Sequence, residues 1–136
     1  MIDLYAPSHL EETIYAMAYE LGLDEYDAPV YVDYEKIGDM LGACFGDSEA
    51  VTVSISEELR GNPLLYALAH EMIHVKQMLS GSLIIEWEIF WHGYDQEKIP
   101  YENRVYEREA YFLENVLVER LKIMGVPAIP TIFWKY

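Results

Sequence analysis

The sequence of 136 residues contains a single cysteine, Cys44, and few basic residues. One cysteine cannot form an intramolecular disulfide, so the chain is no disulfide scaffold and a reducing compartment is expected. Lysine and arginine number 9 against 24 aspartate and glutamate residues, which gives a formal net charge of -15. A surface this negative repels phosphate backbones and anionic lipids. The composition therefore argues against direct binding to nucleic acid or to a membrane surface.

Long apolar runs and linkers are also absent. No window approaches the roughly 20 apolar residues that span a bilayer, and residues 1–4 lack the basic start and apolar run of a signal peptide. No internal repeat and no Gly/Ser-rich linker divides the chain. Apolar residues make up 52% of the sequence, which is enough for a core. We therefore predict one domain over residues 1–136, located in the cytoplasm.

Apolar residues recur at helical spacing in three stretches, residues 9–21, 63–79 and about 101–124. Ser8 and Asn62 are expected to cap the first two helices, and Gly22 and Gly81 to end them. His92-Gly93 is expected to form a turn. Short runs of β-branched and aromatic residues predict strands at 30–34, 40–45, 50–55 and 83–91. The apolar tail, residues 127–136, is expected to pack back as an extended segment. The predicted fold is α+β, with a small and mostly antiparallel sheet packed against three helices.

The second predicted helix carries His70-Glu71-Met72-Ile73-His74, the pattern H-E-x-x-H. Residues four apart lie on one helix face, so the two imidazoles can reach one ion about 2.0–2.1 Å from each nitrogen. Glu71 lies at the neighbouring edge, where it can take a proton from metal-bound water and deliver it to a leaving amine. Composition alone yields this pattern on the order of once in a hundred such chains. Two surface histidines on an amphipathic helix are the simpler alternative, but the central place of the motif in its helix favours a metal site.

Two imidazoles do not complete a hydrolytic zinc site, which takes three protein ligands. Ser80 stands where the longer form of the motif has a third histidine. The downstream helix offers four carboxylates, those of Glu102, Glu107, Glu109 and Glu114. Periodicity does not choose between Glu107 and Glu109, which flank the apolar stripe of this helix about equally, roughly 80° to either side. Glu109 shares its side with apolar residues, so a carboxylate there needs a partner.

Residues 70–77, together with residues 100–110, resemble small gluzincin metallopeptidases, and most of all compact SprT-like or phage-type single-domain proteins. Such families pair a histidine helix with a later helix carrying E-x-x-A, whose first glutamate is the third zinc ligand. The resemblance implies a zincin-like fold in which Glu107 joins His70 and His74 on Zn²⁺, because Ala110 follows Glu107 by three positions. Tyr111 stands where many gluzincins have an Asp or Asn that supports a histidine, which leaves that support unassigned. The resemblance also implies that the strand at 50–55 is an edge strand that pairs with an extended substrate.

The sequence thus predicts a zinc metallopeptidase with Glu71 as general base and acid, acting on peptides or proteins. The acidic surface favours basic substrates. The alternative is a non-catalytic, zinc-containing module that binds proteins; an acidic decoy for a basic partner has only the net charge in its favour. Donors that can stabilise the oxyanion of the transition state are Tyr101, Arg104, Tyr106, Tyr111 and His92.

Overall fold

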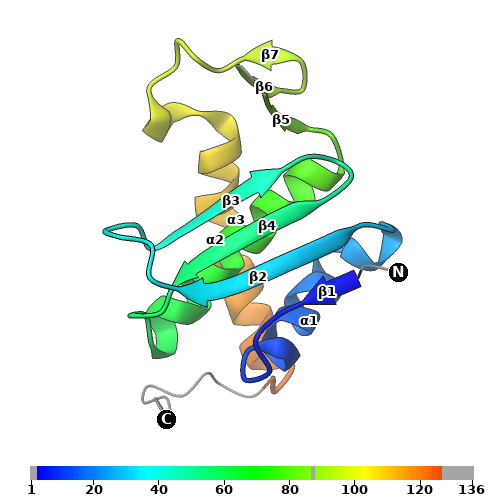
Figure 1. Cartoon of the computed structure of the whole chain (residues 1–136), viewed down its shortest axis with the longest axis vertical. Helices are drawn as coiled ribbons and strands as arrows, with labels where there is room; N and C mark the ends of the chain where they lie inside the picture. Colours follow the sequence, from blue (N-terminus) through cyan, green and yellow to red (C-terminus); the bar gives the residue numbers. More distant parts are fainter. Residues whose placement is uncertain (1–2, 87, 127–136) are drawn as a thin grey trace.

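A computed structural model describes residues 3–86 and 88–126 (Figure 1). Over these ranges the chain forms three α-helices, two short 3-10 helices and two β-sheets. The predicted α+β class is therefore confirmed. The expected packing of the tail, residues 127–136, lies outside the described residues. None of the described helices is both long and apolar enough to cross a membrane.

The larger sheet is mixed, so the prediction of a mostly antiparallel sheet is wrong for it. Its four strands have the order β1-β2-β4-β3. β1 runs parallel to β2 and β2 runs parallel to β4, whereas β3 is antiparallel to β4. β1 is only three residues long, which is too short to show an alternating pattern in the sequence. α1 connects β1 to β2 as a crossover, which is why these two strands run parallel. The elements are β1 (Asp3–Tyr5), α1 (Glu11–Glu20), β2 (Pro29–Glu35), β3 (Gly42–Gly46) and β4 (Val51–Ser56).

The strand expected at an edge, β4, lies inside the sheet between β2 and β3. The prediction that it offers its edge to a substrate is therefore wrong, because both of its sides already carry partner strands. Val51, Val53 and Ile55 are buried, as the alternation predicts. Ser54 and Ser56 are buried too. Within the described chain β3, not β4, forms the edge of the sheet on this side (Figure 1).

The smaller sheet is an antiparallel meander that follows the histidine helix. The single strand predicted at 83–91 is in fact two strands, paired with each other. The turn predicted at His92-Gly93 is confirmed: both residues have positive φ, 50° and 84°, as a two-residue hairpin requires. The strands are β5 (Leu83–Ile85), β6 (Ile89–Trp91) and β7 (Tyr94–Asp95).

The remaining helices are α2 (Gly61–Leu79) and α3 (Val105–Ile123), with the 3-10 helices η1 (Leu23–Glu25) and η2 (Tyr101–Asn103). The glycines expected to stop α1 and α2, Gly22 and Gly81, both have positive φ, which ends a helix without strain. The predicted caps are wrong. α1 and α2 have Leu10 and Arg60 at their N-caps, and no side chain forms a capping hydrogen bond there.

The helix α2 is the centre of the molecule. It packs against β3 and β4 on one side and against α3 on the other (Figure 1). Its predicted apolar stripe is buried throughout: Leu65, Leu68, Met72, Val75 and Leu79. Because it is covered on several sides, α2 also buries three polar residues, Glu71, His74 and Gln77. Buried polar groups cost free energy unless they find partners, so each of these requires an explanation.

Candidate metal centre

His70 and His74 of α2 meet Glu107 of α3, and their possible ligand atoms all lie within 4.8 Å of one another. Nε2 of His74 is 2.6 Å from Oε1 of Glu107, and Nε2 of His70 is 3.2 Å from the same oxygen. The two Nε2 atoms are 3.2 Å apart. In a tetrahedral site with bonds of about 2.0–2.1 Å, neighbouring ligand atoms lie about 3.3–3.4 Å apart. The spacing of the two imidazoles therefore allows both to bind one metal ion.

The orientation of His74 is set by Gln77, one turn further along α2. The amide nitrogen of Gln77 donates to the carbonyl oxygen of Tyr106 and to Oε1 of Glu109, both at 3.0 Å. These two acceptors leave the amide oxygen of Gln77 facing Nδ1 of His74 at 2.7 Å. That oxygen can only accept, so Nδ1 of His74 carries the proton. The Nε2 atom faces Glu107: in the neutral imidazole it is free to bind a metal ion, and in the protonated imidazole it donates to the carboxylate.

The orientation of His70 is set by Glu114, two turns beyond Glu107 on α3. Nδ1 of His70 donates to Oε1 of Glu114 at 3.2 Å. A carboxylate partner on this nitrogen is an acceptor for the Nδ1 proton, while Nε2 faces Glu107 at 3.2 Å. Both histidines therefore have a partner for Nδ1 and can bind a metal ion through Nε2.

Two imidazole Nε2 atoms and a carboxylate oxygen thus converge on one point, and all three are acceptors when the imidazoles are neutral. Such an arrangement needs a cation, because the three atoms otherwise repel one another. Burial alone would raise the pKa of Glu107, but hydrogen bonds from His70 and His74 outweigh it and lower the pKa to about 2. Burial would lower the pKa of His70, but the hydrogen bond to Glu107 and the nearby carboxylates outweigh it and raise the pKa. Without a metal ion, a proton on an imidazole serves as the cation.

Glu71 lies beside the three ligands under the start of β3, and it is only 8% exposed. A methyl group on Gly42 would lie 3.1 Å from both Cγ and Oε2 of this glutamate, so the absence of a side chain at Gly42 leaves room for the carboxylate. Burial raises the pKa of Glu71, His74 and His70 lower it, and the net direction is upward. A carboxyl group with a raised pKa is suited to exchange protons near neutral pH.

Two cavities meet at Glu71. A cavity of about 500 Å³ lies on the His70 side and is also lined by Tyr111 and Glu114. A cavity of about 300 Å³ lies on the His74 side and is also lined by Glu107 and Arg104. Both cavities are bordered by the residues at the start of β3 and by Glu71 itself. The candidate centre therefore lies in the middle of a cleft.

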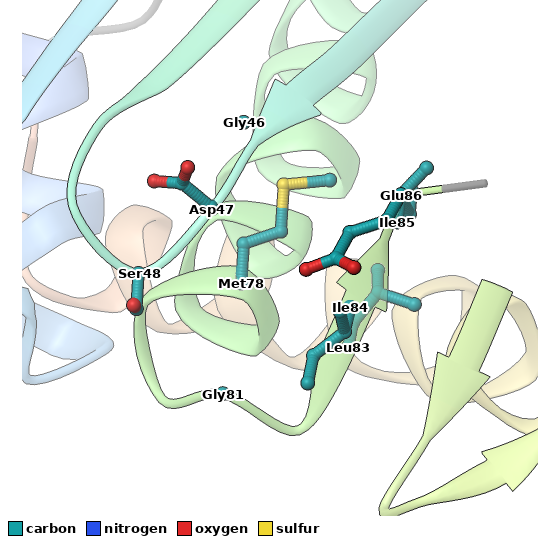
Figure 2. Close-up of a pocket in the computed structure, with 9 residues that line it drawn as sticks. All are labelled: Gly46, Asp47, Ser48, Met78, Gly81, Leu83, Ile84, Ile85 and Glu86. Atoms are coloured by element: carbon teal, nitrogen blue, oxygen red, sulfur yellow. The ribbon is translucent and has the colours of Figure 1, made fainter. Parts of the chain in front are cut away.

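A third hollow, of about 390 Å³, continues the cleft along β3 toward the β3–β4 turn. It shares Met78, Leu83 and Ile85 with the cavity on the His74 side. Figure 2 shows Met78 in the middle of this hollow, with the carboxylates of Asp47 and Glu86 on opposite sides. The three hollows together follow β3 over its whole length.

The structure separates the two glutamates that periodicity left undecided. Glu107 joins the histidines, whereas Glu109 accepts from the side chain of Gln77. The carboxylate of Glu109 therefore has the partner that it was expected to need, although its side of α3 is largely exposed. The fourth candidate, Glu102, is exposed in η2.

The residues considered as oxyanion donors are spread over three places. The ring of Tyr111 lies 4.6 Å from that of His70, measured between centroids, and borders the larger cavity. Arg104 and Tyr106 line the smaller cavity, and Tyr101 borders both. His92 packs against Trp91 in the smaller sheet and lines neither cavity.

The sequence did not predict the orienting role of Gln77 and Glu114, although Glu114 was among the candidate ligands. Gln77 follows His74 by three positions, which places it on the same face of α2. Glu114 follows Glu107 by seven positions, two turns along the same face of α3. Both spacings are readable in the sequence once a metal site is assumed, although Glu114 is recognisable only after Glu107 has been chosen.

No protein-family model, no curated protein and no solved structure matches this chain. The likeness to gluzincins therefore stays a prediction that depends on two short motifs. The function of this protein is inferred below from the geometry of its own site.

Proposed function

We propose that this protein is a zinc-dependent metallopeptidase in which His70, His74 and Glu107 bind the ion. The observation that carries the proposal is the convergence of two imidazole Nε2 atoms and one carboxylate oxygen within 4.8 Å. Two histidines and one glutamate form a ligand set typical of catalytic zinc, which keeps a fourth position open. Zinc bound there would polarise a peptide carbonyl and acidify a water molecule.

Glu71 supplies the proton transfers. Its carboxylate takes a proton from the attacking water and passes it to the leaving nitrogen, so that the peptide C–N bond breaks as a C–O bond forms. Tyr111, whose ring lies 4.6 Å from that of His70, is our proposed donor to the oxyanion. Its burial and the nearby carboxylates raise the pKa of its phenol, which stays protonated.

The substrate on this proposal is an extended peptide. The edge strand β3 offers unpaired backbone groups along the cleft, and a peptide can add to such an edge by backbone hydrogen bonds. A histidine helix beside a mixed sheet with an antiparallel edge strand is compatible with a zincin-like architecture. The net charge of -15 favours basic peptides at long range.

The test compares three near-isosteric variants. Elemental analysis should find one zinc per chain in the wild type, Glu71→Gln and Glu109→Gln, and none in Glu107→Gln. Mass spectrometry of a peptide mixture should detect cleavage by the wild type and Glu109→Gln but not by Glu71→Gln. A wild type without zinc would refute the site. Zinc without any cleavage, or equal cleavage by Glu71→Gln, would leave the non-catalytic binding module as the better account.

A further inference from the structure

Arg104 is the one arginine, and there is no lysine, among the described residues that line the 300 Å³ cavity on the His74 side. Nε of its guanidinium donates to the carbonyl oxygen of Ile99 at 3.0 Å, and one terminal nitrogen donates to the hydroxyl of Tyr106 at 3.2 Å. The guanidinium also lies over the ring of Tyr101, 5.9 Å from its centroid. Three contacts therefore hold the group in place beside the candidate centre.

This arginine has no carboxylate partner in residues 3–86 and 88–126. The lack of a partner is notable in a chain with 24 acidic residues and 9 basic ones. Arg104 is half-buried, and Met78, Leu83 and Ile89 line the same cavity, so a counter-charge there would stabilise the guanidinium. The site therefore has room for an anion that the described chain does not supply.

Tyr106 provides a second donor for such an anion. Its hydroxyl oxygen accepts from Arg104, so its own hydrogen is available to another acceptor. No acceptor in the described ranges takes that hydrogen. A guanidinium and a phenol hydroxyl that contact each other can donate together to the two oxygens of one carboxylate.

The charge balance of the cleft depends on the metal. Without it, the carboxylates of Glu71 and Glu107 oppose the binding of any further anion in the cavity. The two positive charges of a zinc ion formally balance these two carboxylates and leave Arg104 as the excess charge. An anion should therefore bind the zinc-loaded protein better than the metal-free one.

We propose that Arg104, with the hydroxyl of Tyr106, binds a carboxylate of the substrate on the His74 side of the centre. This inference rests on the proposed function and adds a substrate class to it. The substrate is a peptide with an acidic side chain, or its own C-terminal carboxylate, next to the bond that reacts. The long-range preference for basic peptides then applies to the rest of the substrate.

The experiment measures binding by calorimetry to the zinc-loaded Glu71→Gln protein, which is not expected to cleave its ligand. The probes are three acetylated peptides. Two are amidated at the C-terminus and differ only in a central glutamate or glutamine; the third has the glutamine and a free C-terminal carboxylate. At least one of the two peptides with a carboxylate should bind about tenfold or more tightly than the peptide without one. A preference for the first identifies a side chain as the ligand, and a preference for the third identifies the chain end.

The matched variants are Arg104→Gln, Arg104→Lys and Arg108→Gln, all in the Glu71→Gln background. Arg108 lies one turn further along α3, is exposed and lines neither cavity, so its loss should leave the preference unchanged. Arg104→Gln should remove the preference, and Arg104→Lys should keep part of it through the retained charge. Circular dichroism of each variant identifies any that do not fold. If Arg104→Gln does not fold, the inference is tested by Arg104→Lys and by the three peptides on the Glu71→Gln protein.

Equal affinity of all three peptides, or an undiminished preference in Arg104→Gln, would overturn the inference. These outcomes are separate from those that test the peptidase. A protein that binds the carboxylate peptide through Arg104 but never cleaves a peptide refutes the function and retains the carboxylate site. Cleavage by the wild type without any preference for a carboxylate retains the peptidase function and refutes the carboxylate site.

Discussion

The two histidines of the candidate centre lie one turn apart on the same helix, yet they are oriented in different ways. His74 donates to a neutral amide, that of Gln77, which is 2% exposed and has all of its hydrogen-bonding groups occupied. His70 donates to a carboxylate, that of Glu114, near the opening of the larger cavity. One support is therefore buried and uncharged, and the other is charged and close to solvent.

The difference follows from where each imidazole lies. Near His74 a charged support would be expensive, because burial strongly disfavours an unpaired carboxylate. An amide can satisfy both the imidazole and the neighbouring α3 groups without adding charge. Near His70 a carboxylate remains partly hydrated, and it makes the imidazole a stronger base. We therefore expect Gln77 to matter for stability and metal binding together, and Glu114 to matter for metal binding and protonation.

The largest effect is expected from Gln77→Leu. This change removes the partner of Nδ1–H of His74 and one partner each of the Tyr106 carbonyl oxygen, which lies within α3, and of the half-buried Glu109 carboxylate. A buried group left unsatisfied costs about 1–3 kcal/mol, so the metal-free protein should lose up to about 3 kcal/mol of unfolding free energy. Zinc affinity should fall about 100-fold. Urea denaturation and zinc competition with a chelator measure the two effects; a loss of affinity without a loss of stability would contradict the shared role of Gln77.

An intermediate effect is expected from acid. The pKa of Glu107 is lowered in the folded, metal-free protein to about 2, from an unperturbed value of 4.5. The contribution of Glu107 to the free energy of unfolding is therefore fully present above pH 4.5 and is lost as the pH falls toward 2. It amounts to on the order of 3 kcal/mol at most. Denaturation of the metal-free wild type between pH 7 and 3 should show this loss. The same measurement on Glu107→Gln should show a flatter profile, and parallel profiles would mean that Glu107 is not held by the histidines.

The smallest effect is expected from Glu114→Gln, which keeps an acceptor for His70 but removes the charge. Zinc affinity should fall about tenfold and the free energy of unfolding should change little. The pKa of His70, which is raised in the metal-free protein, should move down. A histidine whose pKa is raised in the folded state stabilises the fold below about pH 6.5, and this stabilisation disappears as the pH rises through the pKa of the folded state. In Glu114→Gln the stabilisation should therefore disappear at a lower pH than in the wild type. Proton NMR titration of His70 provides the measurement. A larger loss of zinc affinity than in Gln77→Leu would reverse the comparison.

Much of the site was predictable because it lies on one helix. The spacing of His70 and His74 places both on one face wherever α2 packs, and Glu71 comes with them. The edge strand was not predictable in the same way. The alternation in β4 predicts a strand with one buried face, but the order of strands depends on pairing across the sheet, and β4 is enclosed by β2 and β3.

Local spacing along the chain was enough to predict the three helices and the pair of imidazoles, because these depend on residues three or four apart. Which glutamate faces the histidines, Glu107 or Glu109, follows from how α3 is rotated against α2, and no local spacing contains that. The same rotation brings Glu114 to His70 and Glu109 to Gln77. Local spacing determines which residues share a face, and long-range packing determines what that face meets.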